Sequence, residues 1–220
     1  AVSLVRILKP MVLGEDPLDR ERLYGRLWMR HRLTTLRCIG AVDVALWDIA
    51  GKATGLPLYK YLGAYRSSIP AYASSPGLAS KDAYVAQALE VKAQGVGAYK
   101  IHPPARWEED IRICEAVRNA VGNDYRLMLD STWAYTYTQA LRVGRAIEDL
   151  NYYWYEDPLA EDDIYNCAKL RQKLTIPLMA TEYSPGGFHS YAIWVTSGAT
   201  DYLRGDVAIK GGITACLKAA

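Results

Sequence analysis

The sequence predicts an α/β fold in which a parallel β-sheet, covered by helices, follows a purely helical segment. Three observations carry this prediction. Residues 16–62 show helical patterning, and from residue 69 onwards short apolar or β-branched runs alternate with helical segments. Acidic residues also stand at the ends of four successive expected strands. Strand–helix alternation is typical of a parallel sheet with crossover helices.

The segment Asp16–Leu62 is expected to be helical. Asp16-Pro17, followed by acidic residues at positions 19 and 21, is typical of a helix start, because it combines an N-cap, a first-turn proline and acids near the positive end of the dipole. A second helix is expected where Ile39, Val42 and Leu46 recur on one face with a period near 3.6. The turn sequence at residues 55–57, Gly-Leu-Pro, should end that helix.

Six strands are expected downstream, each a short run bounded by polar or turn residues. They are Ile69–Ala73, Ala98–His102, Arg126–Asp130, Tyr152–Glu156, Pro177–Glu182 and Tyr202–Asp206. The expected helices between them are Asp82–Gln94, Glu108–Val121, Thr138–Leu150, Ile164–Lys173 and Gly187–Ser197.

The ends of four of these strands favour a barrel over an open sheet. Asp130, Glu156, Glu182 and Asp206 follow one another at 26, 26 and 24 residues, one strand–helix unit each. A barrel gathers the carboxyl ends of its strands at one mouth, where its active site lies. Converging carboxylates repel one another unless a divalent cation binds them. The competing interpretation, that these acids are helix N-caps, is weakened because glutamate is a poor N-cap.

Composition excludes several other classes of protein. The formal net charge is +2 and no basic run is visible, so neither nucleic-acid binding nor a membrane partner is expected. Apolar runs stay well below about 18 residues. The four cysteines are widely spaced, which predicts small buried side chains. No secretory signal is visible, so a reducing, cytoplasmic compartment is expected. The first residue is Ala1 rather than methionine, so it is not expected to be the native start.

Several motifs resemble the mandelate racemase branch of the enolase superfamily. The quoted stretches are GAVDVALWDIAGK at 40–52, WYEDPL at 154–159, ATE at 180–182, and Asp206 with GGIT at 211–214. The resemblance implies a (β/α)8 TIM-type barrel and an α+β capping domain. It implies that residues 1–66 are the helical part of the capping domain and that residues 67–220 carry barrel strands one to six. Because a closed barrel needs eight strands, the sequence is expected to be part of a longer chain.

The resemblance also implies a metal site. One Mg²⁺ would be held by Asp130, Glu156 and Glu182, an all-oxygen set that suits a hard cation. The implied reaction removes the proton α to a carboxylate, and the metal stabilises the enediolate. Asp157 is expected to brace the loop rather than to bind metal, and Lys210 is expected to be a surface residue of a turn.

Residues around the metal would complete the implied site. Lys100 and His102 stand where relatives often carry Lys-x-Lys, and their i, i+2 spacing places both side chains on one strand face. Lys100 would bind the substrate carboxylate. His102 would act as acid or base, or merely bind a hydroxyl, and a nearby cation should lower its pKa. Asp206 would pair with a histidine on a seventh strand, and Thr132 stands at a substrate-binding position where relatives often have asparagine.

Four functions remain open at this stage. Dehydration of a sugar acid to a 2-keto-3-deoxy acid is the leading interpretation, and racemisation or epimerisation of a 2-hydroxy acid is the second. A non-catalytic homologue would not need three converging carboxylates. Phosphoryl transfer lacks a glycine-rich phosphate loop. The small-molecule partner is therefore expected to be a carboxylate, and the protein is expected to be a homo-oligomer.

Overall fold

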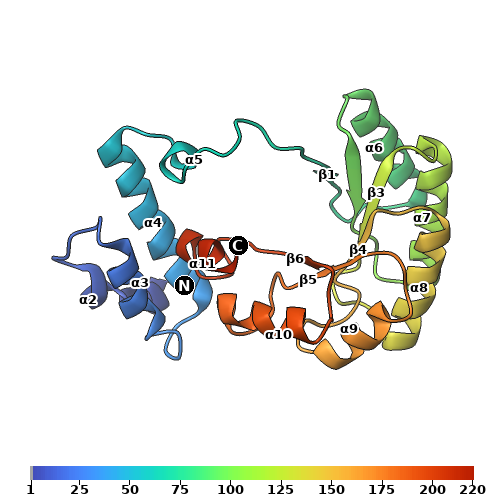
Figure 1. Ribbon diagram of the computed structural model, residues 1–220. Helices are drawn as coiled ribbons and strands as arrows, with labels where there is room; N and C mark the ends of the chain where they lie inside the picture. Colours follow the sequence, from blue (N-terminus) through green and yellow to red (C-terminus); the bar gives the residue numbers. More distant parts are fainter. Residues whose placement is uncertain (1) are drawn as a thin grey trace. The chain divides into compact units, whose positions relative to one another are not determined.

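The computed structural model describes residues 2–220, which divide into two compact units (Figure 1). The helical unit comprises residues 2–68, 182–191 and 205–220. The sheet unit comprises residues 69–181 and 192–204. The expected domain boundary lies between residues 66 and 67. It divides the chain into two continuous segments, whereas each unit here combines separate segments, and it stays a prediction.

The sheet unit is built on one parallel sheet whose strands pair in sequence order, β1 to β6. The strands are β1 (Ala73–Ser74), β2 (Ala98–Ile101), β3 (Arg126–Asp130), β4 (Trp154–Glu156), β5 (Leu178–Ala180) and β6 (Tyr202–Leu203). A doubly wound sheet would reverse its strand order partway. The sequential order confirms the barrel-type arrangement expected from the sequence.

Five helices pack against this sheet with buried apolar residues. They are α6 (Lys81–Ala93), α7 (Trp107–Val121), α8 (Tyr137–Asp149), α9 (Ile164–Arg171) and α10 (Ser190–Thr196). Figure 1 shows α6, α7 and α8 next to one another along one side of the strands. Their apolar faces meet the strands in a core that includes Tyr99, Leu127 and Tyr155, all fully buried. Packing against the helices therefore holds the strands in place, and polar side chains can stand at the carboxyl ends of the strands.

The helical unit contains the N-terminal helices and the end of the chain. Its elements are α1 (Val2–Arg6), α2 (Lys9–Val12), α3 (Arg20–Trp28), α4 (Leu36–Thr54), α5 (Leu58–Tyr61), the 3₁₀ turn η1 (Gly187–His189) and α11 (Ile213–Ala219). The long helix α4 starts at the N-cap Thr35 and ends at Gly55, whose φ of 66° is left-handed. Leu23 and Leu27 on α3 and Ile39 on α4 are buried members of the hydrophobic core of the helical unit.

The GGIT turn is locked onto α4 inside the helical unit. Asp43, fully buried on α4, accepts hydrogen bonds from the backbone N–H of Thr214 (2.9 Å) and from its hydroxyl (2.6 Å). Trp47 Nε1 donates to the same hydroxyl at 2.9 Å. A Cβ on Gly212 would stand 2.2 Å from Asp43 Oδ2, so this close approach requires glycine. Asp43 of the first motif and Thr214 of the last are therefore structural partners.

Several element ends differ from the sequence-based expectation. The first α-helix after Asp16 begins only at Arg20, and Asp16 instead accepts a hydrogen bond from the Leu18 N–H in a short turn. The first strand is β1 at Ala73–Ser74 rather than Ile69–Ala73, and Pro70, inside the expected run, has no N–H to give a ladder. No helix among residues 2–220 is long and apolar enough to cross a membrane.

Candidate active site

Two acidic residues at the ends of neighbouring strands form the centre of the candidate site. Asp130 ends β3 and Glu156 ends β4, and the two are direct register partners. They are 2% and 0% exposed. Lys100 on β2, also 2% exposed, donates to Asp130 Oδ2 at 2.8 Å and to Glu156 Oε2 at 2.9 Å. Three of the residues singled out in the sequence therefore form one buried charged cluster.

The charges of this cluster shift the pKa values of its members. Burial raises the pKa of Asp130, but the hydrogen bond from His102 and the charge of Lys100 outweigh it and lower the pKa to about 2. Burial lowers the pKa of Lys100, and the carboxylates of Asp130 and Glu156 outweigh that effect and raise it above its usual value. Asp130 and Lys100 are therefore both ionised at neutral pH.

His102 lies at the edge of this cluster with both ring nitrogens engaged. Nδ1 lies 2.7 Å from the Ser75 carbonyl, so it carries a proton and donates. Nε2 lies 2.9 Å from Asp130 Oδ2. The hydrogen bond to Asp130 raises the pKa of the ring, and the lowering expected beside a bound cation stays a prediction. The physical reason is that the nearest charge to Nε2 is the Asp130 carboxylate.

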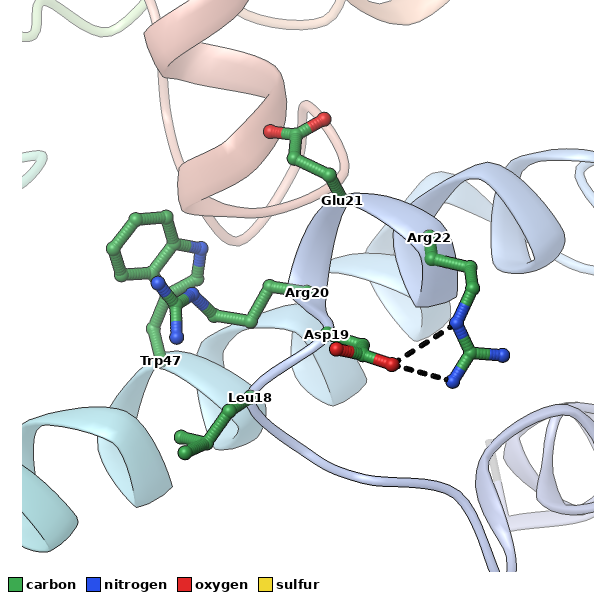
Figure 2. A pocket seen from close by; sticks show the side chains of 6 residues that line it. All are labelled: Leu18, Asp19, Arg20, Glu21, Arg22 and Trp47. Atoms are coloured by element: carbon green, nitrogen blue, oxygen red, sulfur yellow. Dashed lines mark hydrogen bonds and ion pairs between the residues drawn. The ribbon is translucent and has the colours of Figure 1, made fainter.

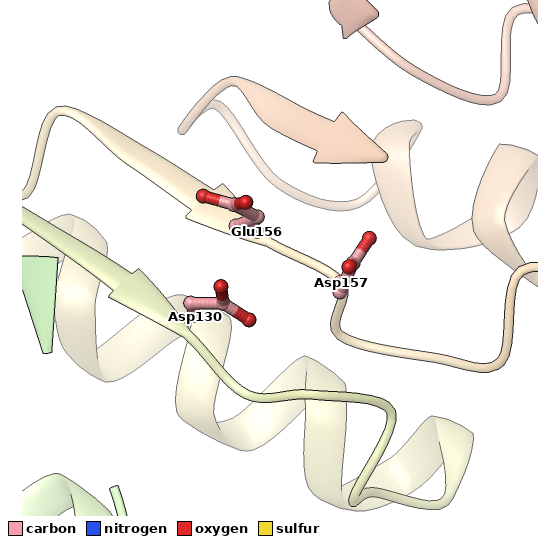
Figure 3. Close-up of side chains that lie close together, drawn as sticks. All are labelled: Asp130, Glu156 and Asp157. Carbon is pink, nitrogen blue, oxygen red and sulfur yellow. The ribbon is translucent and has the colours of Figure 1, made fainter. Parts of the chain in front are cut away.

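Asp157 follows Glu156 directly and contributes a third carboxylate (Figure 3). Asp130, Glu156 and Asp157 each offer one oxygen, and these oxygens lie within 4.8 Å of one another. Carboxylate oxygens are the donors that Mg²⁺ prefers, so the chemistry of this set fits the expected ion. Burial and the nearby charges of Glu161, Asp130 and Glu156 raise the pKa of Asp157 to about 9. In the absence of an ion, the Asp157 carboxyl is therefore harder to ionise than an ordinary aspartate.

The loops that follow β3, β4 and β5 hold non-glycine residues in left-handed backbone conformations. Thr132 and Trp133 have φ values of 48° and 64°, Asp157 has 45° and Thr181 has 91°. Such conformations cost about 1–3 kcal/mol each and concentrate at functional sites. Thr132 is exposed, and its N–H donates to Asp130 Oδ1 at 3.2 Å, which places the residue beside the cluster. Its expected role in substrate binding stays a prediction.

Arg204, which the sequence interpretation missed, also reaches the cluster. It follows β6, and its guanidinium donates to Glu156 and lies 3.7 Å from Asp130 Oδ2. The available signal was its i, i+2 relation to Asp206, which places both residues on one face of an expected strand. The strand itself ends at Leu203.

Two predicted site residues, Glu182 and Asp206, belong to the helical unit. Glu182 is buried and lies two residues past β5, because Thr181 leaves the extended conformation. Asp206 accepts a hydrogen bond from the Ala208 N–H at 2.7 Å and starts a turn. Asp130 and Glu156 lie in the sheet unit, so Glu182 as third ligand and Asp206 as half of a dyad stay predictions.

Lys210 is buried, so the expected surface position is wrong. Lys210 is 1% exposed. Its Nζ donates to the Ser184 carbonyl at 2.8 Å and to the Ser184 hydroxyl at 2.7 Å. It also lies 5.2 Å from the ring centroid of Tyr191. The turn that begins at Asp206 directs Lys210 inward, onto the segment that follows Glu182 in sequence.

A separate pocket of the helical unit lies beside Trp47 (Figure 2). Its lining residues are Leu18, Asp19, Arg20, Glu21, Arg22 and Trp47. The Arg20 guanidinium stacks 4.3 Å from the Trp47 ring centroid, and Arg22 donates to Asp19 at 2.8 Å. None of the site residues predicted from the sequence lines this pocket, and we do not assign it to the candidate site.

Comparison with known proteins gives matches over both parts of the chain. Residues 1–63 match the family "Mandelate racemase / muconate lactonizing enzyme, N-terminal domain", and residues 83–220 match "Enolase C-terminal domain-like". The L-talarate/galactarate dehydratase of Salmonella typhimurium is 34% identical over 94% of this chain and 54% of its own length. The arabinonate dehydratase of Saccharolobus solfataricus is 32% identical over 99% and 60%.

A solved structure gives the same result for the fold. The D-glucarate dehydratase from Agrobacterium tumefaciens, complexed with magnesium, superposes with a TM-score of 0.93 at 37% sequence identity. The match covers 96% of this chain and 60% of that protein. The chain thus spans between about half and two thirds of these relatives.

Proposed function

The chain belongs to the mandelate racemase and muconate lactonizing enzyme family of the enolase superfamily, and from this premise we propose that the protein is a magnesium-dependent sugar-acid dehydratase. It would remove the proton α to the substrate carboxylate and expel the hydroxyl of the next carbon, which gives a 2-keto-3-deoxy acid. The relatives described above are dehydratases of sugar acids. The observation that carries the proposal is the buried Asp130–Glu156 pair with Lys100 between its carboxylates.

Asp130 and Glu156, with Glu182 as the predicted third ligand, would hold the ion. When bound, Mg²⁺ supplies a Lewis acid that stabilises negative charge developing on the substrate carboxylate. Lys100 contributes a fixed positive charge next to the same ligands, which suits a residue that orients an anionic group.

His102 is the proposed acid or base of the sheet unit. The hydrogen bond from Nδ1 to the Ser75 carbonyl fixes the ring so that Nε2 is the nitrogen facing the cluster. Once Nε2 is released from Asp130 and deprotonated, it is the atom that would take the α-proton. A second base on the opposite face, the partner predicted for Asp206, would be needed for racemisation.

The decisive experiment offers the purified protein a library of sugar acids with Mg²⁺ in deuterated water. Formation of a 2-keto product, read by carbonyl derivatisation, supports the dehydratase. Exchange of the α-proton with inversion and without keto product would instead support the racemase or epimerase. If no acid shows product or exchange while the metal binds, the protein is a non-catalytic homologue.

The third ligand is tested separately by Glu182→Gln. The substitution keeps the size of the side chain and removes its charge, so Mg²⁺ affinity measured by calorimetry should fall. The exposed Glu108 at the start of α7 offers a matched control as Glu108→Gln. Equal affinity of the Glu182→Gln protein and the wild type would remove Glu182 from the ligand set.

We also propose that the protein is a cytoplasmic homo-oligomer. Cys38, Cys114 and Cys167 are buried free thiols, which fits a reducing compartment. Light scattering of the purified protein measures the oligomeric state directly, and a monomeric mass would contradict this part of the proposal.

A further inference from the structure

Arg204 is held in place by the end of β5. Its backbone N–H donates to the Ala180 carbonyl and to the Thr181 hydroxyl, each at 2.9 Å. The Thr181 hydroxyl in turn donates to the Arg204 carbonyl at 3.0 Å. The backbone of Arg204 is thus fixed independently of its side chain, and the guanidinium starts from a defined position.

The guanidinium bonds to the same carboxylates that would bind the metal. It donates to Glu156 and lies 3.7 Å from Asp130 Oδ2. Lys100 binds the same two acids from β2. Two basic side chains, Lys100 and Arg204, therefore contact the two acids within the sheet unit. A divalent cation that takes these oxygens must approach both positive charges.

Of the two basic side chains, Arg204 is the one with room to move. The Lys100 side chain is 2% exposed, whereas the Arg204 side chain is 27% exposed. An arginine keeps its proton in proteins. Repulsion by an incoming cation can therefore be relieved by displacement of the guanidinium but not by its deprotonation.

We propose that Arg204 is an internal counter-ion that competes with the divalent metal for Glu156 and Asp130. It neutralises the ligands in the metal-free protein, lowers metal affinity and moves away when the ion binds. This inference rests on the proposed metal site. It concerns a residue of this chain that acts on the ligands rather than on the substrate.

The test is a titration of Mg²⁺ into chelator-stripped protein without substrate, followed by calorimetry. Arg204→Gln removes the charge and leaves the three backbone hydrogen bonds in place. We expect the affinity for Mg²⁺ to rise about tenfold or more, which corresponds to about 1.4 kcal/mol. Arg204→Lys, which keeps a charge on a shorter side chain, should give a smaller rise.

Arg171→Gln is the matched control, because Arg171 pairs with Asp201 on the same unit, outside the cluster. It should leave Mg²⁺ affinity unchanged. Unfolding midpoints in chelator confirm that each variant is folded. If wild type binds Mg²⁺ and Arg204→Gln binds it equally or more weakly, Arg204 positions the ligands and the inference is wrong. If neither protein binds Mg²⁺, the metal assignment itself fails, and the inference falls with it.

Discussion

Replacement of Lys100 by methionine tests whether the protein itself neutralises the buried acids. The substitution keeps an unbranched side chain and removes the charge that donates to Asp130 at 2.8 Å and to Glu156 at 2.9 Å. Removal of one partner from a buried ion pair costs about 3–5 kcal/mol, because it leaves uncompensated charge in the interior. Arg204 remains beside both acids, so we expect a loss near the lower end, about 3 kcal/mol.

The assay is urea unfolding in chelator, with Lys81→Met as control. Lys81 begins α6 in the same unit and is exposed. Substitutions of exposed charged residues change stability by about 1 kcal/mol or less. If Lys100→Met lowers the free energy of unfolding by no more than Lys81→Met does, the cluster does not depend on the lysine charge, and the reasoning is refuted.

The same variant changes the acid stability of the protein. The folded-state pKa of Asp130, about 2, lies below its unfolded value of about 3.9. A lowered carboxyl pKa gives stability that is present above pH 3.9 and lost as the pH falls towards 2. This difference corresponds to about 2–3 kcal/mol. Without Lys100 the pKa of Asp130 is lowered less, so acid unfolding should begin at a higher pH.

Three further predictions follow from single residues. His102→Asn should lower kcat by about 10²-fold or more and stop solvent exchange of the α-proton if His102 is the base; persistent exchange with only a higher KM would make it a binding residue. Lys210→Met should reduce the free energy of unfolding by about 1–3 kcal/mol, because it leaves a buried carbonyl and hydroxyl without this donor; an unchanged urea midpoint would count against it. Gly212→Ala should destabilise by about 1–3 kcal/mol through its clash with Asp43, while Gly77→Ala, with open space at its Cβ, should not.

The central cluster was predictable because it depends on periodicities that the sequence displays. Alternation along β2 places Lys100 inside, and the strand ends place Asp130 next to Glu156. The position of Lys100 and the pairing of Asp130 with Glu156 both follow from strand order and register, and the regular spacing of the strand–helix units indicates that order. The acids at Glu182 and Asp206 lie beyond their strands, and sequence patterning alone did not locate those strand ends.

The misplaced residues depend on features that patterning does not encode. Lys210 is buried because the turn beginning at Asp206 directs it inward, and a lysine in a glycine-rich turn gives no such signal. Arg204 reaches the acids through a long side chain from outside the sheet. The raised pKa of His102 follows from one hydrogen bond to Asp130. Each of these three features depends on a contact between residues that are far apart in the sequence, so it becomes visible only in the structure.

The sequential pairing of β1 to β6 has a consequence for how the protein assembles. Each strand pairs with the strand that precedes it in sequence, so every strand pairing spans only one strand–helix unit. Such short separations keep the loop-closure cost of each step small. Lys100 on β2 contacts both Asp130 on β3 and Glu156 on β4, so each acid has a basic partner within the sheet unit. We therefore predict that the sheet unit folds without an ion, so that its strands remain paired in chelator.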